Sequence, residues 1–303
     1  MVKSGNNSFN TKESPNQTIL YYCLGGGLGH LTRFTAFCHT LAIKPKLITL
    51  QNDYLSNILS RFASDFFILP ENLVSDKAGL KDWVLNIIKQ TNPQKIIIDA
   101  FPGGILGELS NCRRELDNIE IEYIARILKL DTYQKRLESE LPHINKIWQI
   151  EEFGYEQKIW LNNLAQTNNI PINMLKLEYL DFNVDSNIIL PQNSWLIVHS
   201  GSELELQELY EYARDTALLE KVTPNYVIIG QKTKPTFLPK DLPFYNVYPV
   251  TNLLKKASRV VSGAGFNIME QMSQMKAKHM VLPFNRALDD QHLRLKLRSK
   301  SLS

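Results

Sequence analysis

Residues 20–30 read LYYCLGGGLGH, a short apolar run that leads directly into four glycines within five residues. The run predicts a buried strand, and a glycine turn that opens a helix is typical of the βαβ units of parallel sheets. Backbone N–H groups at such a turn approach an anion closely, and the helix dipole favours negative charge. The alternative is a tight turn without a ligand. The dinucleotide pattern GxGxxG fails because His30 stands where a glycine is required, and the Walker pattern lacks its Gly-Lys-Ser/Thr.

Outward from this stretch, short apolar runs alternate with helical patterns, which predicts parallel sheets covered on both faces. Runs such as Ile96-Ile97-Ile98 suit strands buried on both sides. The predicted strands are 18–24, 46–50, 66–69, 95–99, 120–126, 146–150, 195–199, 226–229, 244–247, 259–262 and 279–282. The predicted helices are 31–42, 54–63, 79–90, 106–116, 132–141, 203–219, 252–256, 267–275 and 289–297.

The alternation restarts after a polar stretch, Asp181–Asn193, which contains Pro191. The sequence therefore predicts an α/β protein of two Rossmann-like domains, 18–185 and 186–303. The first 17 residues are polar and predict a disordered tail.

Composition restricts the function classes. Lys plus Arg number 34 and Asp plus Glu number 31, a net charge of +3, which is too mild to indicate a nucleic-acid partner. A local basic patch remains compatible with a phosphate or with peripheral contact at a membrane surface. The three cysteines have no metal-ligand spacing, and the sequence shows no signal peptide or apolar span of 18 residues. We therefore expect a cytoplasmic protein with free thiols.

Two side chains at predicted strand ends could carry acid–base chemistry. His30 ends the glycine loop at the edge where open α/β sheets bind ligands, and imidazole can take a proton near neutral pH. Asp99 ends the strand 95–99 and could orient His30. Equally, His30 could hydrogen-bond its own loop and Asp99 could cap the following helix.

The second half repeats the pattern of strand, small-residue turn and helix. Ser200-Gly201-Ser202 and Gly263-Ala264-Gly265 each follow a predicted strand, where hydroxyl and N–H groups suit phosphate. Ordinary capping of a helix by serine is the alternative. Glu270, one turn into the next helix, could grip a ribose diol, and Asp290 and Gln291 suit sugar hydroxyls.

This constellation resembles the GT-B glycosyltransferases, nearest their MurG-like branch, which uses nucleotide-sugar donors. The resemblance is carried by GGGLGH at 25–30, SGAGFN at 262–267, the acid that follows, and LPFNRALDDQ at 282–291. It implies two Rossmann-like domains facing a cleft, with the nucleotide sugar on the C-terminal domain and the acceptor on the N-terminal one.

The resemblance also implies roles for individual residues. His30 would be the base or a diphosphate contact, Glu270 would hold the ribose, Asp290 with Gln291 would hold the donor sugar, and 248–251 would lie by the base. The residues expected near the donor phosphates are Gly26, Gly27, Gly29, Ser200, Gly201, Ser202, Gly263, Gly265, Phe266 and Asn267.

Two departures from the family pattern concern the second half. Relatives usually place the acid six residues after the last glycine of the turn, but Glu270 is fifth and Gln271 takes the sixth place. The chain also ends twelve residues after Gln291, where relatives usually continue through a closing helix, so the C-terminal domain is expected to be shortened.

The sequence contains neither Asp-x-Asp nor the Glu-x7-Glu of many retaining GT-B enzymes. We therefore expect an inverting, metal-independent hexosyl transfer from a nucleotide-diphosphate sugar, with UDP favoured, to an acceptor hydroxyl. No cofactor is expected beside that co-substrate, and the acceptor and oligomeric state are left open. The alternatives are a nucleotide-sugar epimerase or hydrolase of the same fold, and a degenerate, non-catalytic binding subunit.

Overall fold

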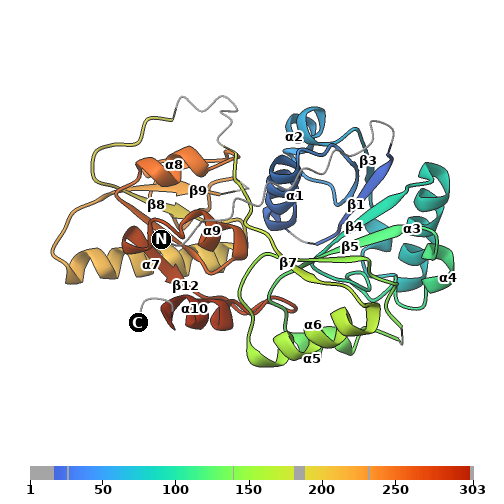
Figure 1. Cartoon of the computed structure of the whole chain (residues 1–303). Coiled ribbons are helices and arrows are strands. Elements are labelled where there is room, and N and C mark those ends of the chain that lie inside the picture. The colour runs from blue at the N-terminus through green and yellow to red at the C-terminus, as the bar shows by residue number, and fades with distance from the viewer. Residues whose placement is uncertain (1–16, 26, 139, 181–187, 231–232, 301–303) are drawn as a thin grey trace, which may run out of the picture.

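A computed structural model of the chain describes residues 17–25, 27–138, 140–180, 188–230 and 233–300. Two sheets form its framework, and every strand pairing in them is parallel (Figure 1). The seven-stranded sheet has the order β3-β2-β1-β4-β5-β6-β7 and the five-stranded sheet the order β10-β9-β8-β11-β12. The predicted α/β class with parallel sheets is confirmed. We call 17–180 the N-terminal half and 188–300 the C-terminal half.

The N-terminal half alternates strands with helices along most of its length. Its strands are β1 (Ile19–Cys23), β2 (Lys46–Thr49), β3 (Asp65–Ile68), β4 (Lys95–Asp99), β5 (Glu120–Ala125), β6 (Lys146–Gln149) and β7 (Ile172–Met174). Its helices are α1 (Leu28–Leu41), α2 (Leu55–Phe62), α3 (Lys77–Thr91), α4 (Arg113–Leu116), α5 (Leu130–Gln134) and α6 (Tyr155–Asn168), with a 3-10 turn at Glu71–Leu73.

The C-terminal half repeats the pattern around the smaller sheet. Its strands are β8 (Ser194–Val198), β9 (Asn225–Ile229), β10 (Phe244–Tyr245), β11 (Arg259–Gly263) and β12 (His279–Leu282). Its helices are α7 (Glu203–Leu219), α8 (Thr251–Lys256), α9 (Phe266–Gln271) and α10 (Gln291–Lys300), with a 3-10 turn at Lys276–Lys278.

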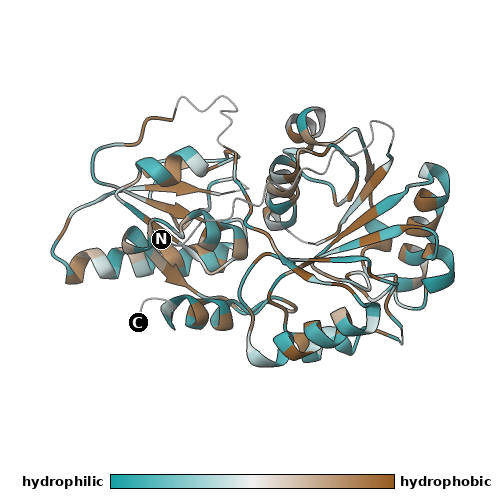
Figure 2. Cartoon of the chain, viewed as in Figure 1, coloured by the Kyte–Doolittle hydropathy of each residue, from teal (hydrophilic) through white to brown (hydrophobic). Residues whose placement is uncertain are grey.

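The central strands are buried on both faces, which explains their unbroken apolar sequences. All five residues of β1 and all five of β4 are buried, and hydrophobic stretches run along strands of both sheets (Figure 2). Side chains on opposite faces of a strand enter different layers of core: Leu20 and Tyr22 pack under α3, whereas Tyr21 packs with α1.

The two halves share apolar packing. Tyr248 and Phe266 of the C-terminal half belong to the core cluster around α1. Leu293 and Leu297 of α10 pack on the core on the other face of the seven-stranded sheet. The helix after Gln291 therefore reaches the N-terminal half. None of the described helices is long and apolar enough to cross a membrane.

Two predicted helices differ most from the structure. Most of 106–116 forms turns, and only Arg113–Leu116 is helical. Gly107 has φ of +80°, and the carbonyl of Arg136 fills the place where a side chain would stand, so a regular helix cannot pass through this residue. The predicted helix 132–141 is wrong in extent, because α5 ends at Gln134. The sequence reading also missed α6 and β7.

The domain limits 18–185 and 186–303 stay a prediction, because 181–187 lie outside the described residues. The predicted tail also lies outside them, apart from Gln17.

Candidate functional site

A cavity of about 610 Å³ lies between the halves, where the turns after β1, β8 and β11 meet. Strand order reverses direction beside β1 and beside β8, and open α/β sheets bind ligands at such switch points. The volume lies within the range of small-molecule sites. We call the lining residues of the N-terminal half the N-terminal wall and those of the C-terminal half the C-terminal wall.

The N-terminal wall carries a buried ionic cluster of three side chains. His30 and Arg33 lie on α1, one helical turn apart, and Asp99 ends the neighbouring strand β4. His30 Nδ1 lies 2.6 Å from Asp99 Oδ2, and Arg33 donates to both carboxylate oxygens, at 2.7 Å from its Nη2 to Oδ2. Asp99 is fully buried, while His30 and Arg33 line the cavity.

The charges of this cluster favour a neutral imidazole. Burial lowers the pKa of His30 below its ordinary 6.5, and the Arg33 and Arg126 guanidiniums lower it further, against the pull of Asp99. Burial alone would raise the pKa of Asp99, but Arg33 and His30 hold it well below its usual range. An ionised Asp99 can accept the Nδ1–H of a neutral His30, which leaves the Nε2 lone pair available to take a proton.

Gly25 is a steric requirement of this arrangement. A side chain at Gly25 would overlap the ring of His30, since its Cβ would lie 2.0 Å from Nε2. The glycine loop therefore runs against the Nε2 edge of the imidazole. The ring also lies 5.8 Å from the ring of Phe101, so it is held from two sides.

The C-terminal wall consists largely of turns. Ser200, Gly201, Gly263 and Gly265 line the cavity, whereas Ser202 does not. The Ser202 hydroxyl accepts from the Glu205 N–H and caps α7, which is the alternative considered for these serines. Phe266, Asn267 and the stretch 247–251 also line this wall.

Gly265 differs from Gly25 because it has open space. A Cβ there would meet nothing within 4 Å, and its backbone has φ of −67°, which any residue can adopt. The space in front of the turn is therefore large enough for a ligand group to approach the backbone.

Asn267 connects the two walls. Its Nδ2 donates to the carbonyl of Gly29 at 2.6 Å, and its Oδ1 accepts from the Tyr179 hydroxyl at 3.0 Å. Gly27 and Gly29 line the N-terminal wall beside this contact. Gly26 lies outside the described residues.

The displaced acid of α9 lies apart from the cavity. Glu270 lines a separate hollow of about 190 Å³, and burial raises its pKa. Gln271 lines the main cavity instead, and its Oε1 accepts from the Thr251 hydroxyl at 2.9 Å. The helix thus presents the sixth residue after the glycine, an amide, where Glu270 was expected.

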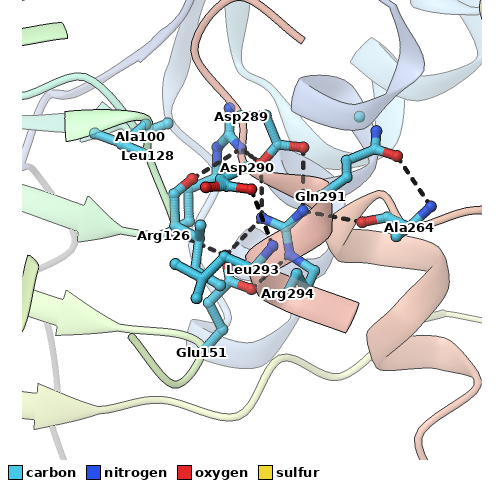
Figure 3. Close-up of polar contacts among 12 residues, drawn as sticks. Ala100, Arg126, Leu128, Glu151, Ala264, Asp289, Asp290, Gln291, Leu293 and Arg294 are labelled. Atoms are coloured by element: carbon cyan, nitrogen blue, oxygen red, sulfur yellow. Dashed lines mark hydrogen bonds and ion pairs between the residues drawn. The ribbon is translucent and has the colours of Figure 1, made fainter. Parts of the chain in front are cut away.

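The side chains of Asp290 and Gln291 already have protein partners (Figure 3). Asp290 Oδ1 accepts from Leu293 N at 2.9 Å and caps α10. Gln291 Oε1 accepts from the N–H groups of Ala264 and Phe284, both at 3.0 Å. Gln291 lines the cavity and Asp290 does not.

Asp289, which the sequence reading did not single out, lines the cavity and joins the halves. It receives Arg126 at 2.6 Å and Arg294 at 2.7 Å, and Arg294 also contacts Glu151 (Figure 3). These four side chains form one ionic network across the base of the cavity.

Sequence reasoning also missed Arg33 and the pair formed by His199 and Glu205. Arg33 is three residues from His30, but the predicted helix 31–42 began after His30, whereas α1 begins at Leu28 and places both side chains on one helical face. His199 Nε2 lies 2.9 Å from Glu205, which Arg286 also contacts. The contact with Arg286 has no signal in the sequence, because 81 residues separate the partners.

Cys23, His30 and Asp99 present ligand atoms within 4.8 Å of one another. A cation there would face the guanidinium of Arg33, which occupies both oxygens of Asp99. Burial also raises the pKa of the Cys23 thiol, which disfavours the thiolate that a metal requires. The residues present therefore fit a metal ion poorly.

No protein-family model and no curated protein matches the sequence. Solved structures match in fold. The spinosyn forosaminyltransferase SpnP has a TM-score of 0.58 at 11% identity, with 94% of this chain and 83% of that chain covered. The spinosyn rhamnosyltransferase SpnG complexed with thymidine diphosphate has a TM-score of 0.53 at 11% identity, with 94% and 92% covered.

A UDP-N-acetylglucosamine 2-epimerase from Rickettsia bellii has a TM-score of 0.55 at 12% identity, covering 91% of this chain and 81% of that chain. At these identities the likeness concerns the fold alone. Two parallel sheets with the switch-point cavity between them give this chain the GT-B fold, which it shares with glycosyltransferases.

Proposed function

We propose that this chain is a glycosyltransferase that moves a hexosyl group from a nucleotide-diphosphate sugar to an acceptor hydroxyl, with inversion and without a metal ion. UDP is the favoured nucleotide, and thymidine diphosphate, bound in the SpnG structure, is the next to test. The buried free thiols of Cys23, Cys38 and Cys112 suit a cytoplasmic location.

The observation that carries this proposal is the placement of His30. Its Nδ1 contacts Asp99, its ring lines the cavity, and the turns at Ser200–Gly201 and Gly263–Asn267 form the opposite wall. An acceptor hydroxyl held between the walls would give its proton to His30 Nε2 as its oxygen attacks the anomeric carbon. Asp99 would stabilise the resulting imidazolium and fix the tautomer.

The leaving diphosphate requires groups that offset its charge. Backbone N–H groups of the turns and the start of the 17-residue helix α7 can donate to phosphate oxygens. Gly265 carries no side chain, and no protein group lies within 4 Å of the place where one would stand. A metal ion is then unnecessary, and a chelator should leave turnover unchanged.

A thermal-shift panel of UDP-, TDP- and GDP-sugars tests the donor half of the proposal. A ligand at 100 times its Kd stabilises a protein by about 2.7 kcal/mol. We expect one nucleotide family to stabilise the chain and inorganic phosphate at the same concentration to do so far less. Absence of stabilisation by every nucleotide sugar would overturn the proposal.

The non-catalytic alternative has a specific observation in its favour. Asp290 and Gln291, expected to hold the donor sugar, already have protein partners, and Gln271 stands where a carboxylate is usual. Donor binding with no nucleotide release across a broad acceptor panel would support a binding subunit. Nucleotide release with no acceptor present would instead support an epimerase or hydrolase.

A further inference from the structure

We infer that the N-terminal wall binds an anionic group, a carboxylate or a phosphate carried on an apolar body, through Arg126 and Arg136. The inference rests on the proposed function, because this wall is the side assigned to the acceptor. It specifies the class of acceptor: an acidic molecule with an aromatic or aliphatic portion beside its reacting hydroxyl.

The first support is the charge of the cavity. Among the described lining residues, four are arginines and one is an acid, Asp289. Two of the arginines are neutralised by acids outside the lining: Arg33 by Asp99, and Arg286 by Glu205. The other two, Arg126 and Arg136, face a single acid in the lining, Asp289, so the lining keeps an excess of positive charge.

Arg126 is incompletely paired although it is deeply buried. Its Nη1 donates to Asp289 at 2.6 Å, and Asp289 also accepts from Arg294, which has Glu151 as a second acid partner. Its Nε has no hydrogen-bond partner among the residues that the structure describes. The residue is only 6% exposed and lines the cavity. A buried donor without a partner costs free energy, so the guanidinium of Arg126 is less completely satisfied than that of Arg33.

Arg136 adds a second charge on the same wall. Its Nη1 donates to the carbonyl of Ile105 at 2.9 Å, a neutral acceptor, and within the described ranges no ion pair with a carboxylate is found for it. The nearby Glu108 is a weak counterion, since burial raises its pKa to about 7. Its carboxylate oxygens also accept hydrogen bonds from the Tyr22 hydroxyl and the Leu106 N–H.

The surface between the two arginines is apolar. Phe101, Ile105 and Leu288 line the cavity there. The guanidinium carbon of Arg126 lies 5.6 Å from the centre of the Phe101 ring, and Phe101 packs on Tyr133 at 5.6 Å. Such a surface accommodates a ring or alkyl portion, and the arginines at its borders hold an acidic substituent.

Matched small probes test this inference on the full chain. The probes are 4-hydroxybenzoate, its neutral counterpart 4-hydroxybenzamide, and phenyl phosphate, each titrated by ligand-observed NMR. We expect at least one anion to bind about tenfold more tightly than the amide, with the ratio falling as salt is raised. The benzoate and phosphate arms distinguish the two sources of negative charge.

Two variants and one control locate the site. Arg126→Gln and Arg136→Gln should each weaken the preferred anion about tenfold and leave 4-hydroxybenzamide unchanged. Arg214→Gln is the control, because Arg214 is exposed on α7 and stacks on Tyr210 away from the cavity. Arg126→Gln leaves Asp289 paired with Arg294, and Arg136→Gln removes no ion pair among the described residues. If one variant fails to fold, the other still tests the inference.

Three results would overturn the inference: equal binding of the anions and the amide, no effect of either variant, or displacement of the anion by UDP or TDP in direct competition. The last result would place the anion in the donor's diphosphate site. Each of these results can be distinguished from a failure of the proposed function. Donor binding is measured without an acceptor probe and does not require Arg136.

Discussion

His30, Asp99 and Arg33 build the N-terminal wall from side chains that fix one another through short ionic contacts, whereas the turn at Gly265 in the C-terminal wall has open space in front of its backbone. The first arrangement leaves little freedom for a ring or a charge to move. The second leaves space at Gly265 that no protein group fills. A cavity with these two walls can hold a proton acceptor rigidly on one side and receive a variable, highly charged group on the other.

The largest expected effect comes from removing the ring on the N-terminal wall. His30→Ala should lower turnover by about 10²–10⁴-fold, the usual contribution of general-base catalysis, and leave donor affinity almost unchanged. His39→Ala, on the same helix but half-exposed, is the matched control. Steady-state kinetics and donor titration of both variants measure the split.

The same experiment has two informative extensions. Asp99→Asn should act in the same direction but more weakly, because Asp99 orients the ring. A neutral imidazole with lowered pKa also predicts that turnover declines only below about pH 6.5, as His30 takes up a proton. If His30→Ala weakens donor binding as much as turnover, His30 contacts the diphosphate and the difference between the walls is lost.

Breaking the ionic cluster should cost stability. Arg33→Met leaves Asp99 buried without its guanidinium, and loss of one partner of a buried ion pair costs about 3–5 kcal/mol. The pKa of His30 should also rise, because a nearby positive charge is gone. Urea unfolding measures the first effect and NMR titration of the histidine the second. Arg286→Met, at a half-exposed pair of the other wall, should cost clearly less.

A pair of glycine variants sharpens the comparison of the walls. Gly25→Ala would overlap the ring of His30 and should destabilise the chain by about 1–3 kcal/mol. Gly265→Ala meets nothing in the protein and should leave stability within about 0.5 kcal/mol, yet its methyl group would occupy the approach to the turn and weaken donor binding. Equal effects of the two substitutions on stability would contradict the distinction.

The smallest expected effects concern the pH dependence of stability, through two buried titratable side chains. Glu108 in the N-terminal half has its pKa raised to about 7, mainly by burial, so its contribution to stability is present below pH 4.5 and lost as pH rises through 7. His279 in the C-terminal half has its pKa lowered to about 3, mainly by burial, so stability is lost as pH falls from 6.5 towards 3. Glu108→Gln and His279→Gln should change the pH dependence of the unfolding free energy with opposite sign.

The fold was largely predictable because its strands are short, apolar and regularly spaced. Lys95–Asp99 was predicted to the residue, since a strand buried on both faces needs an unbroken apolar run. The segment 106–116 was not predicted correctly. The carbonyl of Arg136, 29 residues further along, packs against Gly107, and the Glu108 carboxylate accepts a hydrogen bond from the Leu106 N–H. Both contacts hold the segment in turns.

The sequence predicted the candidate site only where the order of the strands in the sheet brings two residues together. The ends of β1 and β4 are neighbours in any sheet of this order, which brings His30 to Asp99. The partners of Gln291 and the contact of Arg126 with Asp289 depend on how the halves pack, which no local pattern encodes. Gln271, and not Glu270 as expected, faces the cavity. Successive residues of a helix are rotated by about 100°, so a shift of one residue decides which side chain faces the cavity.

The amide of Asn267 holds the loop of His30 and the turn of Gly265 together through one side chain. If a ligand on one side changes the affinity for a ligand on the other side through this contact, the second ligand changes the affinity for the first by the same factor. On the proposed function, a donor that draws Asn267 towards its phosphates would weaken the contact of Asn267 with Gly29, and an acceptor that strengthens this contact would change the affinity for the donor. On the proposed function, part of the coupling between donor affinity and acceptor affinity would therefore pass through this single amide.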